Sequence, residues 1–200
     1  MSGTEKIRNM IMNCPRGSIF FPEDFSFVGG VKLVGAALMR LCDEGIITRV
    51  AQGIYCYPQI DDKYGMGQLM PSIDEIAHAI SNRDKSRIVP TGTYAMNILG
   101  LSTQLQANVV YYTDGSPRRV NVGNGRGILF KKSNEMKRFA YKNELMQLIV
   151  AALREIGNGK VSEEEINIIK NRISEVNDAE FNKDIALAPA WVQNLLKEIR

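Results

Sequence analysis

The sequence predicts an α+β protein, with helical segments at both ends and strand-rich segments between them. Apolar residues recur at helical spacing over 31–43 and 144–156. Runs of β-branched and aromatic residues with glycine turns fill 46–57 and 108–132. We therefore expect an N-terminal domain over 1–58, a linker over 59–71, and a C-terminal domain over 72–200 in which helices surround a small antiparallel sheet.

Residues 31–58 hold the most informative pattern, an amphipathic helix that runs into a tight hairpin. The apolar face of this helix, at i, i+3, i+4 and i+7, consists of Val34, Ala37, Leu38 and Leu41. Gly45 suits the positive φ that follows a helix, and two strand-forming runs flank Gln52-Gly53. A helix followed at once by a two-stranded wing is typical of a winged helix-turn-helix domain, which lays the helix in the major groove of DNA.

The preceding residues supply the other elements of such a domain. Thr4 is expected to cap a helix over 5–13, residues 18–20 to form a short strand that joins the hairpin, and Pro22 to begin a short helix over 22–25. The inward-facing residues of the first helix are expected to be Ile7, Met10 and Ile11. Gly29-Gly30 then forms the turn before the long helix, so the order of elements is complete by Tyr57.

Capping signals and turns predict the elements of the C-terminal domain. The expected capping residues are Ser72, Thr91, Asn143 and Ser162, and the helices they begin reach to about residues 82, 100, 156 and 175. Strands over 108–113, 118–122 and 126–132 are expected to form a meander with turns at 114–115 and 123–125. Pro189 begins a last helix with Trp191, Leu195 and Ile199 facing inward.

The composition indicates in which cellular compartment the protein is found and which partners it can have. No apolar run approaches the ~18 residues of a membrane span, and the first residues lack the pattern of a signal peptide, so we expect a cytoplasmic protein with no membrane partner. Cys14, Cys42 and Cys56 are then expected to be buried thiols. The net charge of +3 is unevenly distributed: residues 1–70 are neutral, 71–150 carry +5, and 151–200 carry −2.

The face of the 31–43 helix opposite its apolar stripe is the first candidate site. Lys32 can reach a phosphate or a guanine edge, and Gly35 and Ala36 allow close approach of the helix backbone to the groove. The candidate DNA-binding residues on the helix and the wing are Lys32, Gly35, Ala36, Met39, Arg40, Thr48, Arg49 and Gln52. One alternative is that the domain contacts protein instead, and another is that Arg40 forms an ion pair with Glu44 at i+4.

A basic stretch in the middle of the chain is the second candidate site. Residues 118–142 contain eight Lys or Arg residues and a single acid, Glu135. The candidate residues for a second nucleic-acid surface are Arg118, Arg119, Arg126, Lys131, Lys132, Lys137 and Arg138. The alternative is that these charges only solvate a strand face.

No motif points to catalysis or to a cofactor. The sequence lacks a phosphate-binding Walker loop, a nucleophile elbow, a zinc-protease motif and any Asp-x-Asp pair. His78 and the three cysteines lack the short Cys-x₂₋₄-Cys spacing of a zinc site. We therefore expect a protein that is not an enzyme and needs neither a metal nor another cofactor.

Four segments, residues 37–41, 49–58, 90–104 and 110–115, together resemble the AbiEi-type antitoxins of type IV toxin–antitoxin (abortive-infection) systems, and the resemblance extends from Thr4 to about Arg172. It implies that the winged domain represses the protein's own operon and that the C-terminal part carries antitoxin activity. It also implies a nucleotidyltransferase toxin that is countered without a stable direct complex. This chain has Gly30-Val31 where relatives often carry polar residues at the start of the third helix.

The expected function is thus a DNA-binding autorepressor and antitoxin, with duplex DNA of its own promoter as the partner. Inverted repeats about one helical turn apart would bring two copies together on the DNA. Two alternatives stay open. One is a winged-helix regulator whose C-terminal domain senses a ligand or oligomerises, and the other is an RNA-binding accessory protein.

Overall fold

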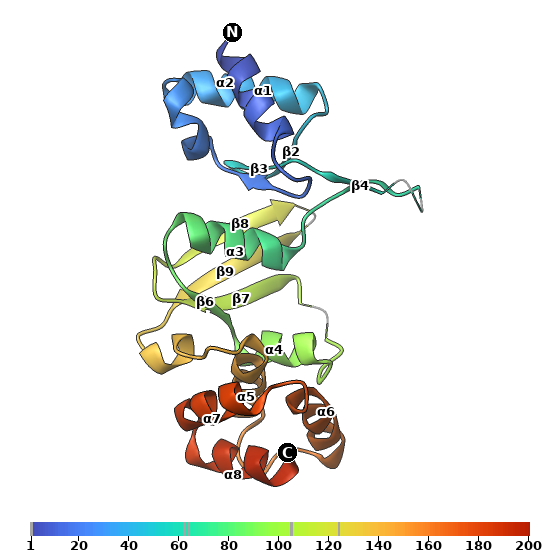
Figure 1. Cartoon of the computed structure of the whole chain (residues 1–200), viewed down its shortest axis with the longest axis vertical. Coiled ribbons are helices and arrows are strands. Elements are labelled where there is room, and N and C mark those ends of the chain that lie inside the picture. Colours follow the sequence, from blue (N-terminus) through green and yellow to red (C-terminus); the bar gives the residue numbers. More distant parts are fainter. Residues whose placement is uncertain (1, 62, 64, 105, 124) are drawn as a thin grey trace. The chain divides into compact units, whose positions relative to one another are not determined.

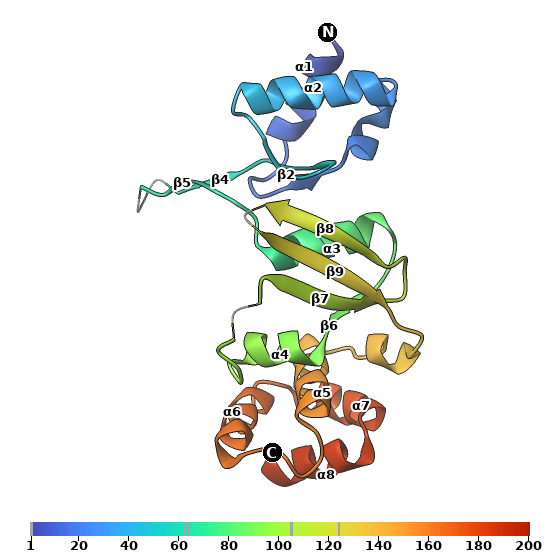
Figure 2. The same cartoon turned by 180° about the vertical axis from the view of Figure 1, so that it is seen from behind.

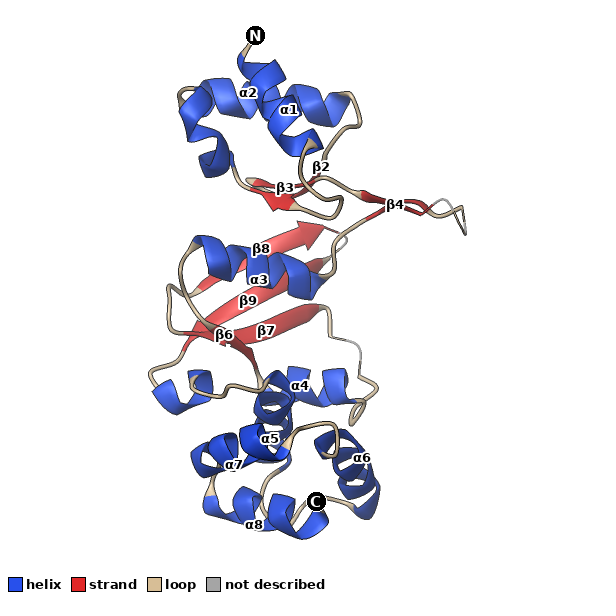
Figure 3. Cartoon of the chain, viewed as in Figure 1, coloured by secondary structure: helices blue, strands red, loops and turns tan. Residues whose placement is uncertain are grey.

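The computed structural model of the chain describes residues 2–61, 63, 65–104, 106–123 and 125–200. Helices dominate both ends of the chain and strands lie between them (Figure 3), which confirms the α+β class. The chain divides into two compact units. Unit 1 comprises residues 1–80 and 120–127, and unit 2 comprises residues 81–119 and 128–200.

Unit 1 begins with helices packed over a small sheet. Its elements are α1 (Gly3–Met12), β1 (Ile19–Phe20), the 3₁₀ helix η1 (Pro22–Val28), α2 (Val31–Asp43), β2 (Thr48–Ala51), β3 (Ile54–Cys56), β4 (Gln59–Asp61), β5 (Gly67–Leu69) and most of α3 (Ile73–Arg83). The first three strands pair antiparallel in the order β1-β3-β2, with Phe20 opposite Tyr55 and Thr48 opposite Cys56. The expected short strand therefore does join the hairpin.

The apolar stripe of α2 forms the centre of the core of unit 1. Val34, Ala37, Leu38 and Leu41 are all buried, as predicted, together with Ile7 and Ile11 of α1. Met10 is 38% exposed, so its predicted inward position is wrong. The cap of α1 is Ser2 rather than Thr4, because the Ser2 hydroxyl accepts the Glu5 N–H while the Glu5 carboxylate accepts the Ser2 N–H.

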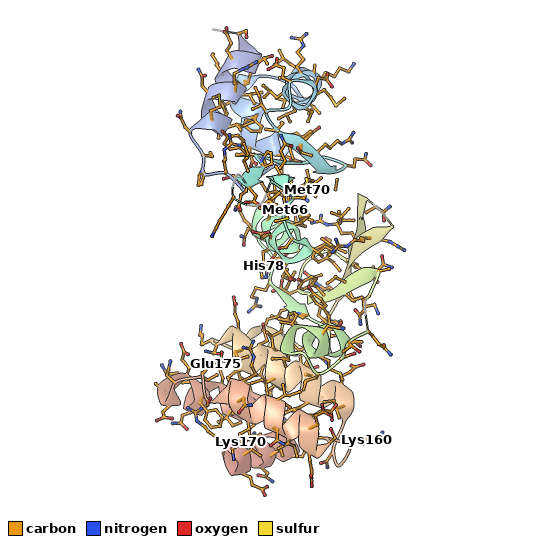
Figure 4. The ribbon with its side chains drawn as sticks, turned by 90° about the vertical axis from the view of Figure 1, so that its right-hand side faces the viewer. Met66, Met70, His78, Lys160, Lys170 and Glu175 are labelled. Carbon is orange, nitrogen blue, oxygen red and sulfur yellow. The ribbon has the colours of Figure 1, made fainter. Side chains whose placement is uncertain are left out.

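The segment expected to be a linker contains a two-stranded hairpin, β4–β5, in which Ile60 lies opposite Gln68. Gln68 ties this hairpin to neighbouring parts of unit 1. Its Nε2 donates to the carbonyl of Gly45 at 3.2 Å, and its Oε1 accepts from the Thr48 hydroxyl at 3.2 Å. Ile60, Met66 and Met70 are exposed, and the last two are labelled in Figure 4.

Unit 2 combines most of a sheet with a group of helices (Figure 1). Its elements are β6 (Ile88–Pro90), α4 (Gly92–Leu99), β7 (Asn108–Thr113), the first residues of β8 (Arg118–Gly123), most of β9 (Arg126–Lys132), η2 (Met136–Phe139), α5 (Glu144–Ile156), α6 (Glu163–Ile173), α7 (Asp178–Asp184), η3 (Ile185–Leu187) and α8 (Ala190–Ile199). β6, η2, α7 and η3 were not anticipated from the sequence.

The strand order is β6-β7-β9-β8, so the predicted meander is wrong (Figure 2). The N–H of Ser133 donates to the carbonyl of Thr113, which brings the carboxyl ends of β7 and β9 together. The segment after β7 therefore does not close a hairpin with β8. Instead, Asp114 accepts both the backbone N–H and the Nε of Arg87 at 2.7 Å, beside the start of β6. The predicted turn over 123–125 includes Asn124, which lies outside the described residues.

The helices of unit 2 share one core built around α5. Ile149 and Leu153 are fully buried there, as are Val192 and Leu196 of α8. The predicted inward stripe of α8, Trp191, Leu195 and Ile199, lies one position away and is only partly buried. The caps are as predicted at Asn143 and Ser162, whose side-chain oxygens accept the backbone N–H groups of Met146 and Glu165.

Within the described part of the chain, no single helix has the length and apolarity needed to cross a membrane. One pair of helices, η1 and α2, which meet at a bend of 112°, is long and apolar enough together, but only by length and composition.

Candidate nucleic-acid interface

The outward face of α2 combines cations with small side chains. Lys32, Ala36, Met39 and Arg40 are exposed and Gly35 is half-buried, on the side of α2 away from its core stripe. A Cβ atom built on Gly35 meets no other atom within 4 Å, so the helix backbone is open to close approach there. The prediction of which α2 residues face solvent is confirmed, whereas their contact with DNA stays a prediction.

The start of α2 is unlike the start of α1. Gly30 caps α2 without a side-chain hydrogen bond, and the first turn carries no acid. Val31 is 83% exposed in that turn, and Phe27 in the preceding η1 is 64% exposed. No carboxylate therefore offsets the positive end of the helix dipole, which favours an approaching anion. The exposed apolar groups suit contact with thymine methyl groups.

The hairpin β2–β3 presents part of the predicted wing. Arg49 and Gln52 are exposed, and Gly53 completes the turn with φ of +70°. Thr48 is different, because it is half-buried and its hydroxyl donates to Gln68 of β5. The structure therefore gives Thr48 a role in holding two hairpins together that the sequence pattern did not reveal.

Ion pairing changes the charge balance of this face. Glu44 pairs with Arg8 of α1, so the Arg40–Glu44 pair considered from the sequence does not form. Three exposed cations, Lys32, Arg40 and Arg49, then stand against the exposed carboxylate of Asp43. The neutral net charge of residues 1–70 thus conceals a local excess of positive charge on the outward side of α2 and β2.

The seven candidate residues of the basic stretch over 118–142 do not all belong to the same unit. Arg126 belongs to unit 1, whereas the other six residues belong to unit 2. Arg118 pairs with Asp84 and lies 5.7 Å from the centre of the Phe130 ring, so it acts at least partly as a structural residue. The Lys132 ammonium donates to the carbonyl of Asp114, and Arg119 donates to the side chain of Asn108 at 3.0 Å.

Arg138 belongs to a cluster that the sequence did not reveal. Glu135 accepts the Nε of Arg138 at 2.7 Å and an Nη of Arg154 on α5 at 2.7 Å. The Arg154 hydrogen bond, aided by the charge of Arg138, outweighs partial burial and holds the pKa of Glu135 below its usual value. Arg138 also lies 4.6 Å from the centre of the Tyr112 ring.

The cysteines and the histidine do not form a metal centre. His78 lies exposed on α3 (Figure 4), Cys14 and Cys42 are half-buried, and Cys56 is buried. Burial, with a smaller effect of the Glu75 charge, raises the pKa of Cys56 to about 11. Among the residues that the structure describes, no group of three or more His, Cys, Asp or Glu side chains is placed to hold a metal ion.

Comparison with known proteins gives a family but no activity. No curated protein matches the chain. Among solved structures, it is similar to the RV2827C protein from Mycobacterium tuberculosis, with 13% sequence identity and a TM-score of 0.43 over 98% of this chain and 80% of that one. A family model matches residues 6–181, which include α2, the β2–β3 hairpin and the Glu135 cluster. The chain therefore belongs to the family described as "Family of unknown function (DUF6088)".

Proposed function

We propose that unit 1 contains a winged helix-turn-helix module that binds duplex DNA with α2 and the β2–β3 hairpin. The observation that carries this proposal is the outward face of α2, where Gly35 and Ala36 lie between Lys32 and Arg40. Small residues in the middle let the helix lie deep in a groove. The cations at either end are eight residues apart, about 12 Å along the helix, so they can reach phosphates at opposite ends of the contact. The ~10–12 Å cross-section of a helix matches the ~12 Å width of the major groove.

The β2–β3 hairpin adds contacts beside the helix in this arrangement. Arg49 and Gln52 are exposed on it and would reach phosphates or the edge of the minor groove. Met39 and Val31 contribute apolar contact to thymine methyl groups.

The biological role that we propose rests on the resemblance of residues 37–41, 49–58, 90–104 and 110–115 to AbiEi-type antitoxins. The chain represses its own operon, with two copies on inverted repeats, and acts as the antitoxin of a type IV system against a nucleotidyltransferase toxin. It works by binding rather than by catalysis, without a cofactor and without a stable complex with the toxin. It acts in the cytoplasm, where its operator lies.

A gel-shift assay with a duplex from the chain's own promoter tests DNA binding. Lys32→Ala and Arg49→Ala should each weaken binding by about 1–3 kcal/mol, or roughly 5- to 150-fold, and should flatten the salt dependence of the affinity. Lys170→Ala is the matched control, because Lys170 is an exposed lysine on α6 of unit 2 (Figure 4). Affinities of both unit 1 variants within twofold of wild type would exclude this face.

Co-expression with the adjacent gene tests the antitoxin role. We expect the product of the neighbouring gene to arrest growth when it is expressed alone. Co-expression of this chain should restore growth. The variant Arg119→Ala/Lys131→Ala should reduce rescue without disturbing the fold, because both side chains are exposed. A neighbouring product that is harmless, or that stays toxic beside the intact chain, would contradict the role.

A further inference from the structure

A small pocket in unit 2 gathers three cations from two neighbouring segments. Lys137 and Arg138 come from η2 and Arg154 comes from α5, and their side chains line the pocket together with Tyr141 and Gln147. The remaining wall is apolar, with Val89 of β6 and Val150 of α5 among its residues. The enclosed part has room for about one water-sized group, and it opens to solvent.

The charge of this pocket is positive even after its ion pairs are counted. Glu135 neutralises one positive charge, because both Arg138 and Arg154 donate to its carboxylate. Asp184, the other carboxylate near Tyr141, does not line the pocket and is occupied as an acceptor for the backbone N–H groups of Lys142 and Asn143. Three cations against Glu135 leave a formal charge of +2 at the pocket.

The donors of the two guanidinium groups are only partly used. A guanidinium carries five N–H donors. Arg138 uses Nε for Glu135, and Arg154 uses one donor from each Nη for the same carboxylate. Glu135 thus holds both groups in place while other donors stay available to a ligand. This arrangement is preorganised, so less side-chain entropy is lost when a ligand binds.

Neutral groups and apolar walls complete the pocket. Gln147 donates to the carbonyl of Arg138 at 2.8 Å, which joins α5 to η2 at the pocket wall. Burial raises the pKa of Tyr141 to about 12, so its phenol stays protonated at pH 7 and remains a hydrogen-bond donor. The apolar side chains exclude water from one side, which strengthens the attraction between the cations and an anion.

We propose that this pocket binds a terminal phosphate group. A terminal phosphate is close to a dianion at pH 7 and has three free oxygens, which match a pocket of charge +2 with several convergent donors. An internal phosphodiester carries a single charge and only two free oxygens, so it matches a pocket of charge +2 with several donors less well. The bound group belongs either to a free nucleotide or to the end of a nucleic-acid strand.

Isothermal titration of the full chain with inorganic phosphate tests the pocket. Saturable binding is expected, and Lys137→Gln should weaken it by roughly tenfold or more, because the change removes one charge-assisted contact. Lys137 is exposed on a one-turn 3₁₀ helix, so its replacement leaves the fold intact. Arg154→Gln should weaken binding further, with circular dichroism as the check on folding.

Lys170→Gln is the control, since it removes an exposed lysine of the same unit outside the pocket. Absence of saturable binding at millimolar phosphate would overturn the proposal, and so would equal affinities of Lys137→Gln and wild type.

Three further titrations identify the source of the phosphate. Tighter binding of AMP than of a 5′-phosphorylated oligonucleotide assigns the pocket to free nucleotides, and the reverse assigns it to strand ends. If a 5′-hydroxyl oligonucleotide binds as tightly as its phosphorylated form, the pocket does not recognise the terminal phosphate, which would contradict both assignments. The proposal is independent of DNA binding by unit 1, because every residue that lines the pocket belongs to unit 2.

Discussion

At the level of single residues, the sequence predicts burial well where apolar residues recur at a clear helical spacing. It predicts the hydrogen-bond and ion-pair partners of side chains poorly. The α2 stripe from Val34 to Leu41 is buried as expected, because a core-facing helix has only one apolar face to offer. Thr48 and Arg118 were expected on nucleic-acid surfaces, but their partners are Gln68 and Asp84, which lie 20 and 34 residues away in the sequence. Local pattern carries no information about such distant partners.

Cys56 gives a prediction for the pH dependence of stability. Its folded pKa of about 11 lies above the ordinary thiol value of 9.0, so its contribution to stability is present below pH 9.0 and is lost as the pH rises through 11. The wild type should lose about 2 kcal/mol more than Cys56→Ala between pH 8 and pH 11 in urea unfolding. Parallel stability curves for the two proteins over this range would contradict the burial of this thiol.

At the scale of elements, helices were easier to predict than the sheet. Caps are local, so Ser72, Asn143 and Ser162 could be found from residues three positions apart. The strand order β6-β7-β9-β8 could not be found in this way. It depends on hydrogen bonds between residues far apart in the sequence, from Ser133 to Thr113 and from Arg87 to Asp114. α7 was missed since its seven residues are too few for a periodic pattern, although Asn177 caps it.

The cap of α5 can be tested by a single substitution. Asn143 accepts the N–H of Met146 at 3.0 Å and donates to the Glu180 carboxylate at 2.7 Å, so it also joins α5 to α7. Asn143→Ala should lower the free energy of unfolding by about 1–2 kcal/mol. Asn167→Ala, at an exposed position within α6, is the control and should change stability by less than about 0.5 kcal/mol. Equal effects of the two changes would show that the cap contributes nothing.

At the scale of the whole molecule, each unit has its own hydrophobic core. Leu38 is fully buried in unit 1 and Leu153 in unit 2, within separate clusters of apolar side chains. The sequence predicted two domains, over 1–58 and 72–200, with a linker over 59–71 between them, whereas residues 59–80 group with the N-terminal unit. It gave no sign that residues 120–127 group with the N-terminal unit, because that grouping brings together residues far apart in the chain.

Separate cores predict separate responses to core substitutions. Leu38→Ala and Leu153→Ala should each cost about 2–5 kcal/mol in the unit that holds the residue. Hydrogen exchange followed by mass spectrometry should show faster exchange in α1 and α2 for the first variant, and in α5 and α8 for the second. Identical exchange profiles for the two variants would mean that the chain unfolds as one cooperative body.

Contact of α2 and the β2–β3 hairpin with duplex DNA is the basis of the proposed function. The most direct measurement is the change in amide NMR shifts of the ¹⁵N-labelled full chain during titration with its promoter duplex. The largest changes should fall on residues 31–40 and 48–53, and they should weaken as salt is raised. Changes confined to unit 2, with residues 31–40 and 48–53 unaffected, would contradict the claim.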